Sequence, residues 1–394
     1  MKPLLRQASE DQPIGDSRNA ALRRGLDWLR GVAWPFWASN ALDRARGGFV
    51  ERFSLEGIPL DPGFKRARVA ARQVYVFSHA ALLGFPGAIE IAERGYAFLT
   101  DKYLLSEGVW ARRVSTCGDP IDVRQDLYDL AFILFALSWW ARASNDKGVI
   151  RLARETLAAL KTRLAHPAGR GYRHSEGAEA PFEQNPHMHL LEAMICLGEV
   201  SGEDVFVDEA DDLFQLAREV FVGEGDVLPE LFDEDWAPEA RPRVEPGHHF
   251  EWTWLLMRYR DLTGAKEALP LARRLFEFAV RCGSSRQTGL VFDAVDPTGA
   301  PVDADHRIWP QLEAVKAWIA MEEATGVASE PAVAALLDRI LRSYLEPAHP
   351  GLWIDHVTKD LTPKVEFAPT STLYHIFLAL SEVFKRAERG RLPD

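Results

Sequence analysis

Gly289-Leu290-Val291-Phe292-Asp293 begins one of six versions of a single sequence pattern. In this version the turn Asp296-Pro297-Thr298-Gly299 and an apolar stretch near 309–324 follow. Each version has a Gly-aromatic or Leu-aromatic segment, most have a polar turn downstream, and helical periodicity follows, with a repeat of about 60 residues. The other five segments are 47–51, 108–112, 171–174, 228–232 and 351–355. Short strands that flank such turns predict small β-hairpins.

Two helices are predicted between successive hairpins, from apolar residues that recur with the helical period. Two of the starts are supported by proline, since Pro186 follows Asn185 and Pro310 stands in a first turn. The predicted helices lie near 17–33, 68–83, 87–104, 125–143, 147–165, 186–200, 203–222, 247–263, 266–282, 309–324, 329–345 and 370–387.

Twelve helices in six pairs can close into an (α/α)6 barrel, also called a toroid, or stack into an open solenoid. The repeat stops at six, as ring closure requires, and no linker, low-complexity stretch or charge block divides the chain. We therefore predict an all-α fold, with one (α/α)6 barrel domain over residues 1–394 and short β-hairpins in its connecting loops. The helix after each hairpin is the more apolar of its pair, as in 127–140 and 373–380, and should form the inner ring.

Composition excludes several classes of partner and compartment. Forty-six basic and 58 acidic residues give a net charge of -12, which argues against nucleic acid or an anionic membrane as partner. The 3 cysteines are widely spaced and form no CxxC, so neither a disulfide framework nor a cysteine zinc site is expected. No apolar run is long enough for a signal peptide or a membrane span, so a cytoplasmic protein is expected.

Polar residues recur near the starts of the predicted inner helices, where burial of an unpaired charge would be costly. Taken singly, each has an ordinary explanation: a satisfied core histidine, a core tryptophan, or a buried ion pair between Arg72 and Glu313. In a closed ring, however, equivalent positions on successive inner helices converge at one mouth, and their joint placement favours a shared pocket. The set comprises Arg72, Tyr128, Asn185, His189, His248, Glu251, Trp309, Glu313 and His375.

Spacing within the helices supports the shared pocket. Asn185 and His189 are four apart and share a helix face, as do His248 and Glu251, which are three apart. A glutamate beside a histidine can orient the imidazole and raise its pKa. An indole four residues from a carboxylate, as in Trp309 and Glu313, suits a sugar, whose C–H face stacks while its hydroxyls form hydrogen bonds.

Two stretches of the chain are specific enough to compare with known families: Asn185-Pro186-His187-Met188-His189-Leu190-Leu191-Glu192 and Glu245-Pro246-Gly247-His248-His249-Phe250-Glu251-Trp252. They resemble the N-acylglucosamine 2-epimerase family, which includes sugar 2-epimerases and mannose-type isomerases. Trp309-Pro310-Gln311 with Glu313, and Ser371-Thr372-Leu373-Tyr374-His375, strengthen a resemblance that runs from about residue 47 to residue 375. It implies an (α/α)6 barrel in which two histidines, here His248 and His375, move protons at sugar C1–C2. It also implies that His189 assists ring opening, that Arg72 contacts substrate oxygens, and that the other pocket positions bind substrate: Asn185, Tyr128, Glu251, Trp309 and Glu313.

The resemblance and the chemistry together predict an aldose-ketose isomerase that interconverts D-mannose, or a similar free aldose, and D-fructose through an enediolate. Histidine has an unperturbed pKa of about 6.5 and serves as base or acid near neutrality. Return of the proton to the opposite face of C2 would instead give a sugar 2-epimerase. The ending Tyr374-His375-Ile376-Phe377 resembles the mannose isomerase branch of the family and departs from the His-x-Pro-Arg pattern of other members.

Three other functions remain open. A zinc-dependent isomerase would take its ligands from His187 with His189 and from His248-His249 with Glu251. However, helical residues two apart point about 200° apart, so no metal or other cofactor is expected. A glycoside hydrolase would need two carboxylates across the scissile bond, from Glu251, Glu313 or Asp126. A helical-repeat scaffold would turn over no sugar.

The partner is expected to be a small monosaccharide, and no prediction of the oligomeric state follows from the sequence. Several arginines could bind an anionic sugar, although arginine is usually solvated at the surface and a free sugar is favoured. These arginines are Arg66, Arg68, Arg241, Arg243 and Arg307.

Overall fold

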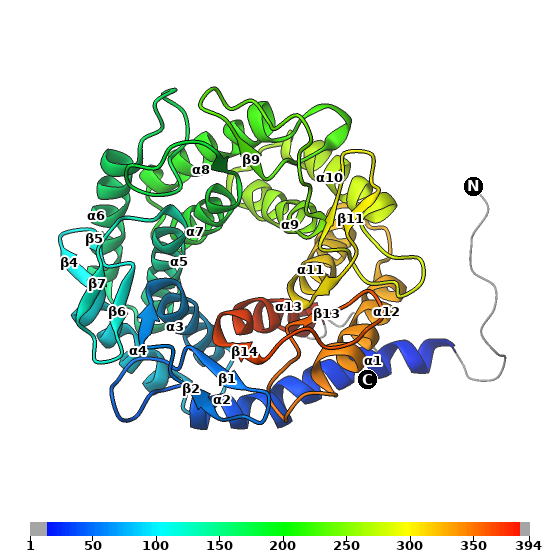
Figure 1. Ribbon diagram of the computed structural model, residues 1–394, viewed down its shortest axis with the longest axis horizontal. Helices are drawn as coiled ribbons and strands as arrows, with labels where there is room; N and C mark the ends of the chain where they lie inside the picture. Colours follow the sequence, from blue (N-terminus) through cyan, green and yellow to red (C-terminus); the bar gives the residue numbers. More distant parts are fainter. Residues whose placement is uncertain (1–13, 387–394) are drawn as a thin grey trace.

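The computed structural model describes residues 14–386 and shows an inner ring of helices enclosed by an outer ring (Figure 1). The inner helices are α3 (Ala67–Leu82), α5 (Leu127–Ser144), α7 (Asn185–Ser201), α9 (Pro246–Thr263), α11 (Ile308–Thr325) and α13 (Leu373–Arg386). The outer helices are α1 (Ile14–Asp27) with α2 (Trp34–Asn40), α4 (Ala88–Tyr103), α6 (Lys147–Leu164), α8 (Asp204–Leu216), α10 (Ala268–Cys282) and α12 (Glu330–Ile340). The inner helix is the more apolar of its pair, as expected, except that α9, which carries several polar site residues, is no more apolar than α10.

The helix boundaries differ from the prediction in a few places. The first outer helix runs past residue 33, because a π-helical turn (Trp28–Ala33) leads into α2 and Pro35 occupies the first turn of α2, where proline is tolerated. The predicted helices 203–222 and 329–345 end in π-helical turns (Ala217–Phe221 and Leu341–Leu345). The last predicted helix begins as a 3-10 turn (Thr370–Thr372), and its final residue, 387, lies outside the described residues.

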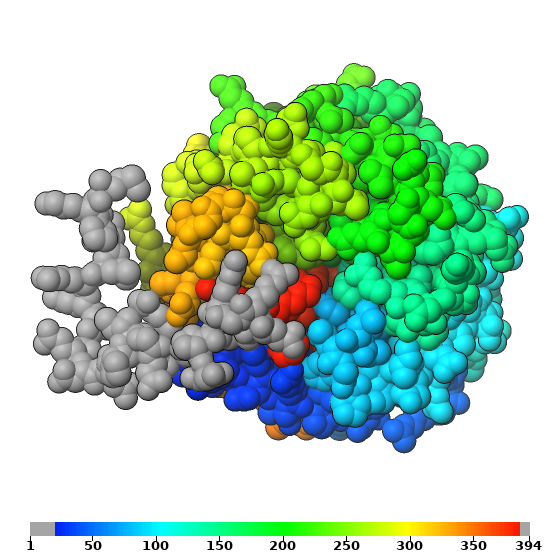
Figure 2. Space-filling model, turned by 180° about the vertical axis from the view of Figure 1, so that it is seen from behind, coloured from blue at the N-terminus to red at the C-terminus, as the bar shows by residue number. Residues whose placement is uncertain are grey.

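Two contacts join the last repeat to the first and close the ring. Strand β14 (Phe367–Pro369) pairs antiparallel with β1 (Arg52–Ser54), and α13 packs against α3 as well as α11. Seen from the opposite side, the repeats follow one another around the molecule, with α13 near the centre (Figure 2). The (α/α)6 barrel is therefore confirmed, and the open solenoid is excluded.

The strands lie in the loops between each outer helix and the next inner helix. Four hairpins form as predicted: β1 with β2 (Pro59–Leu60), β4 (Leu104–Ser106) with β5 (Val109–Trp110), β6 (Arg113–Ser115) with β7 (Pro120–Asp122), and β10 (Ala294–Val295) with β11 (Pro301–Asp303). Other strand pairs are not hairpins within one repeat but join neighbouring repeats. These are β3 (Phe64–Arg66) with β6, β8 (Phe182–Glu183) with β9 (Leu231–Phe232), and β12 (His306–Arg307) with β13 (His356–Val357).

A carboxylate near the end of several recurring segments fixes the start of the following inner helix. Glu51, Glu230 and Asp293 each accept a hydrogen bond, at 2.6, 3.3 and 2.7 Å, from the backbone N–H just before α3, α9 and α11. The first N–H groups of a helix lack partners within the helix, so such contacts stabilise its start. The recurring pattern thus brings equivalent positions of the inner helices to the same end of the ring.

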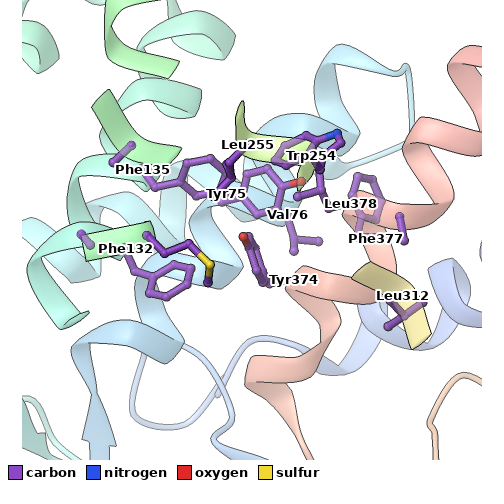
Figure 3. Packing of buried hydrophobic residues seen from close by; sticks show 14 of the residues in the cluster. Tyr75, Val76, Phe132, Phe135, Trp254, Leu255, Leu312, Tyr374, Phe377 and Leu378 are labelled. Carbon is purple, nitrogen blue, oxygen red and sulfur yellow. The ribbon is translucent and has the colours of Figure 1, made fainter. Parts of the chain in front are cut away.

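Side chains fill the centre of the inner ring (Figure 3). Tyr75 of α3 lies 4.5 Å from Phe135 of α5 between ring centroids, and Phe132 lies 5.2 Å from Tyr374 of α13. Truncating a buried phenylalanine of this kind typically costs about 3–5 kcal/mol. Within residues 14–386, no helix combines the length and the apolar character that crossing a bilayer requires.

Candidate functional site

A cavity of about 430 Å³ lies at the end of the ring where the inner helices begin. Every inner helix contributes at least one predicted site residue to its wall. These are Arg72 (α3), Tyr128 (α5), Asn185 and His189 (α7), His248 and Glu251 (α9), Trp309 (α11) and His375 (α13). Two larger hollows, of about 670 and 770 Å³, lie near α2 and contain none of these residues, so size alone does not mark the site.

His248 is oriented by a carboxylate from the loop before its helix. Its Nδ1 lies 2.9 Å from Glu230, whose other oxygen accepts a hydrogen bond from Gln184 at 3.0 Å. Burial alone would lower the pKa of His248, but the charge and hydrogen bond of Glu230, together with the charges of Glu245 and Glu251, outweigh it and raise the pKa to about 9. The prediction that Glu251 orients His248 is therefore wrong, because Glu251 shares the helix face but not the contact.

His375 has the opposite electrostatic environment. Its Nδ1 lies 2.7 Å from Glu313 Oε1, and Lys316 Nζ lies 2.6 Å from Glu313 Oε2. Burial lowers the pKa of His375 to about 4, partly offset by Glu313 and reinforced by Arg72 and Lys316. His375 is thus a neutral imidazole near pH 7.

Glu313 lies behind His375 and does not line the cavity, although it was predicted to bind substrate. The ion pair between Arg72 and Glu313, considered from sequence, does not form, because Glu313 pairs with Lys316. Since Glu313 follows Trp309 by four residues, it lies about 6 Å deeper along the helix axis. At that depth its carboxylate contacts His375 Nδ1 from behind the cavity wall.

The indole of Trp309 lies between the two histidines. Its ring centroid is 5.0 Å from that of His248 and 5.8 Å from that of His375. A sugar stacked on this indole would meet a protonated histidine on one side and a neutral one on the other. Two titratable groups whose pKa values are driven apart in this way are typical of an acid/base pair.

Arg72 carries a positive charge into the cavity without a carboxylate partner in the described part of the chain. Its Nη2 donates to Tyr128 Oη at 2.7 Å and its Nη1 to the Ser371 carbonyl at 3.4 Å. Its guanidinium lies 4.0 Å from the ring centroid of Phe132. This uncompensated charge can stabilise a substrate oxygen that becomes negative.

His189 lies deeper in the cavity, beside two buried glutamates. Its Nδ1 is 3.2 Å from Glu192 and 3.9 Å from Glu251, and burial holds its pKa well below the usual value. Tyr374 donates to Glu192 at 2.5 Å. Burial, together with the charge of Glu313, raises the pKa of Glu251 well above its usual range, which favours a protonated carboxyl group.

The histidine pairs that suggested a metal site point in different directions. His187 accepts a hydrogen bond from the Tyr172 N–H at 2.9 Å, and His249 Nε2 lies 3.2 Å from the Asp226 carbonyl, so both face away from the cavity. His187 and His189, two apart on α7, thus point in different directions, as residues two apart on a regular helix do.

Two other groups of three side chains do bring possible ligand atoms within 4.8 Å of one another. These are His189 with Glu192 and Glu251, and Glu251 with Glu313 and His375. The ammonium of Lys316 already pairs with Glu313, and its interaction with all three glutamates, Glu313 first, outweighs burial and raises its pKa. The ammonium of Lys316 is thus the cation among these buried glutamates, and we assign no metal ion to either group.

Several residues of the site were not singled out from sequence. Glu230 stands in a recurring segment as Glu51 and Asp293 do, so aligning the repeats would have predicted its helix-capping role but not its contact with His248. Lys316 is three residues after Glu313, a spacing that predicts a helix-face pair. The cavity wall also contains Glu183, Leu231, Arg243, Glu245, Arg307 and Thr372.

Comparisons with known proteins agree with this architecture. Residues 47–379 match the family model described as N-acylglucosamine 2-epimerase (GlcNAc 2-epimerase). A mannose-6-phosphate isomerase from Rhizobium meliloti (strain 1021) is 34% identical over 368 residues, which cover 90% of this chain and 95% of that protein. A D-mannose isomerase from Thermobifida fusca is 27% identical over 68% of this chain and 72% of that protein. The structure of cellobiose 2-epimerase from Spirochaeta thermophila DSM 6192 superposes with a TM-score of 0.85 at 24% identity, covering 96% of this chain and 99% of that one.

Proposed function

Because the chain belongs to the N-acylglucosamine 2-epimerase family, whose relatives are sugar isomerases and epimerases, we propose that it interconverts D-mannose, or a similar free aldose, and D-fructose. The observation that carries this proposal is the pair of histidines flanking Trp309. The pKa of His248 is about 9 and that of His375 about 4, so one donates and the other accepts a proton near neutrality.

The proton transfers follow from these charge states. With the sugar in its open-chain form, His375 Nε2 takes the proton from C2, and the C2–H electrons form the C1–C2 double bond. Arg72 stabilises the negative charge that develops on the enediolate oxygens, and a proton donated by His248 to O1 converts the enediolate to the enediol. His375 then delivers its proton to C1 while His248 takes the proton from the O2 hydroxyl, which becomes the ketose carbonyl. Both histidines return to their starting states.

Epimerisation at C2 uses the same first step and differs in where the proton returns. Two histidines on different sides of Trp309 are compatible with either route. The isomerase is favoured by the resemblance of residues 371–377 to the mannose isomerase branch and by the names of the two relatives compared above.

A phosphorylated sugar is the second candidate substrate. Arg243 and Arg307 line the cavity, and the 34% identical relative is named for mannose 6-phosphate. Both arginines already face carboxylates, however: Arg243 Nε lies 3.1 Å from Glu245 and Arg307 Nε lies 3.9 Å from Asp293. A phosphate would have to compete with these carboxylates, which favours the free sugar.

A panel of sugars, assayed with and without a chelator, separates the candidate functions. The panel contains D-mannose, D-mannose 6-phosphate, N-acetyl-D-glucosamine and cellobiose, with products identified by chromatography. We expect fructose from mannose and unchanged rates after exhaustive chelation, because Lys316 supplies the cation of the buried cluster. Turnover of mannose 6-phosphate but not mannose would support the second candidate. Loss of activity on chelation, restored by zinc, would contradict the metal-free account, and release of glucose from cellobiose would indicate a hydrolase.

A further inference from the structure

Lys316 is a fully buried lysine beneath the cavity, with 0% of its side chain exposed. Lysine is almost never fully buried without a partner, because removing an ammonium from water is costly. Its Nζ lies 2.6 Å from Glu313 Oε2 and 4.2 Å from the ring centroid of Trp254 on α9. It does not line the cavity, so it has no direct contact with a substrate there.

The carboxylates around Lys316 come from three inner helices. Glu313 is on α11, Glu251 on α9 and Glu192 on α7, and each favours the charged form of the lysine. Both oxygens of Glu251 lack a hydrogen-bond partner in the described residues. Because burial favours the protonated form of Glu251, the negative charge that Lys316 chiefly offsets in the barrel interior is that of Glu313.

The contact between Glu313 and His375 selects one form of the imidazole. A carboxylate only accepts hydrogen bonds, so the proton between Glu313 Oε1 and His375 belongs to Nδ1. This leaves the lone pair on Nε2, the atom that acts as base in the proposed reaction. Burial alone would raise the pKa of Glu313, but Lys316, followed by His375, outweighs it and keeps Glu313 ionised.

We propose that Lys316 is a positioning residue that acts on His375 through Glu313, by keeping Glu313 an anion that accepts the Nδ1 proton. The inference rests on the proposed role of His375 as a base. The charged and titratable groups that face His375 are Glu313 and Lys316 on α11, Arg72 on α3, Glu251 on α9 and His189 on α7.

Lys316→Met removes the ammonium and retains most of the side-chain volume, and its pH profile is the test. Without the lysine, either Glu313 takes up a proton or His375, no longer repelled by Lys316, becomes more basic. Both changes raise the pH at which kcat/KM falls on the acidic side of the pH profile, its acidic limb. We expect Lys316→Met to lose about tenfold in kcat/KM between pH 8 and pH 4, a shift of about one pKa unit, while the wild type loses only about twofold because the pKa of His375 is about 4.

Lys65→Met is the matched control. Lys65 is also buried, and its Nζ lies 2.9 Å from Asp43, but this pair is outside the cavity. The control should lower thermal stability without moving the acidic limb. An unmoved limb in Lys316→Met, whether activity is uniformly reduced or unchanged, would overturn the proposal.

A second measurement does not depend on the fold of the variant or on activity. Wild-type protein with ¹⁵N-labelled histidine should show His375 with Nδ1 protonated and Nε2 unprotonated from pH 5.5 to pH 8, with the resonances assigned by their loss in His375→Gln. An Nε2-protonated His375 would overturn the inference even if mannose is converted to fructose. Failure of the wild type to convert any aldose would instead overturn the proposed function.

Discussion

Replacing His375 or His248 by alanine is expected to reduce turnover by about 10²–10⁴-fold, the usual contribution of a positioned acid or base. In the first variant no neutral imidazole is left to accept the C2 proton. In the second, the protonated group held by Glu230 is lost. Initial rates of fructose formation from mannose, with circular dichroism to verify folding, provide the measurement.

His249→Ala is the control for this experiment. His249 is adjacent to His248 on α9 and equally buried, but it stacks on Phe278 with ring centroids 4.7 Å apart and faces away from the cavity. It should lower stability and leave kcat per folded molecule close to that of the wild type. Near-wild-type activity in His375→Ala or His248→Ala would remove that histidine from the mechanism.

Glu230→Gln is expected to move the basic limb of the pH profile toward neutrality. Glu230 is the main group that raises the pKa of His248 to about 9, so the variant should lose the His248 proton at lower pH. Activity that needs protonated His248 is present below this pKa and lost above it. A fall of one pKa unit corresponds to a loss of about fivefold in kcat/KM at pH 9, and a larger fall to a larger loss, with a smaller effect at pH 6.5.

Glu51→Gln separates this electrostatic effect from the helix-capping role that both glutamates share. Glu51 accepts from the N–H before α3 as Glu230 does before α9, but it has no contact with His248. It should reduce the melting temperature and leave the basic limb in place. If the two variants have the same pH profile, Glu230 does not act through His248.

Most of the fold was accessible from sequence because its determinants are local. Apolar residues with the helical period and prolines in first turns placed the twelve helices within a few residues. There are two kinds of exception. Pro35 would be expected to end a helix but lies in the first turn of α2, and π-helical turns have no clear sequence signal. The pairing of β14 with β1, which closes the ring, joins residues more than 300 positions apart and could only be inferred from the number of repeats.

The cavity wall was predictable for a different reason. In a ring of repeats, equivalent positions converge, so one polar residue near the start of each inner helix suffices to locate the mouth. The depth of each side chain along its helix and its hydrogen-bond partners were not predictable. Helical spacing put Glu313 on the same face as Trp309 but could not show that it lies one turn lower, behind His375. Likewise, the contact of His248 with Glu230 depends on a loop conformation that periodicity does not describe.

The central claim is that this chain moves a proton between C2 and C1 of mannose, and deuterium incorporation tests it most directly. Wild-type protein is incubated with D-mannose in heavy water, and early products are followed by ¹H and ²H NMR. The account predicts fructose as the main early product, with glucose minor or absent, and with deuterium at C1 in those molecules for which the His375 proton exchanges with heavy water before it is delivered. Glucose deuterated at C2 as the main early product would contradict the isomerase and indicate a 2-epimerase, and the absence of both products and exchange would contradict proton transfer on mannose altogether.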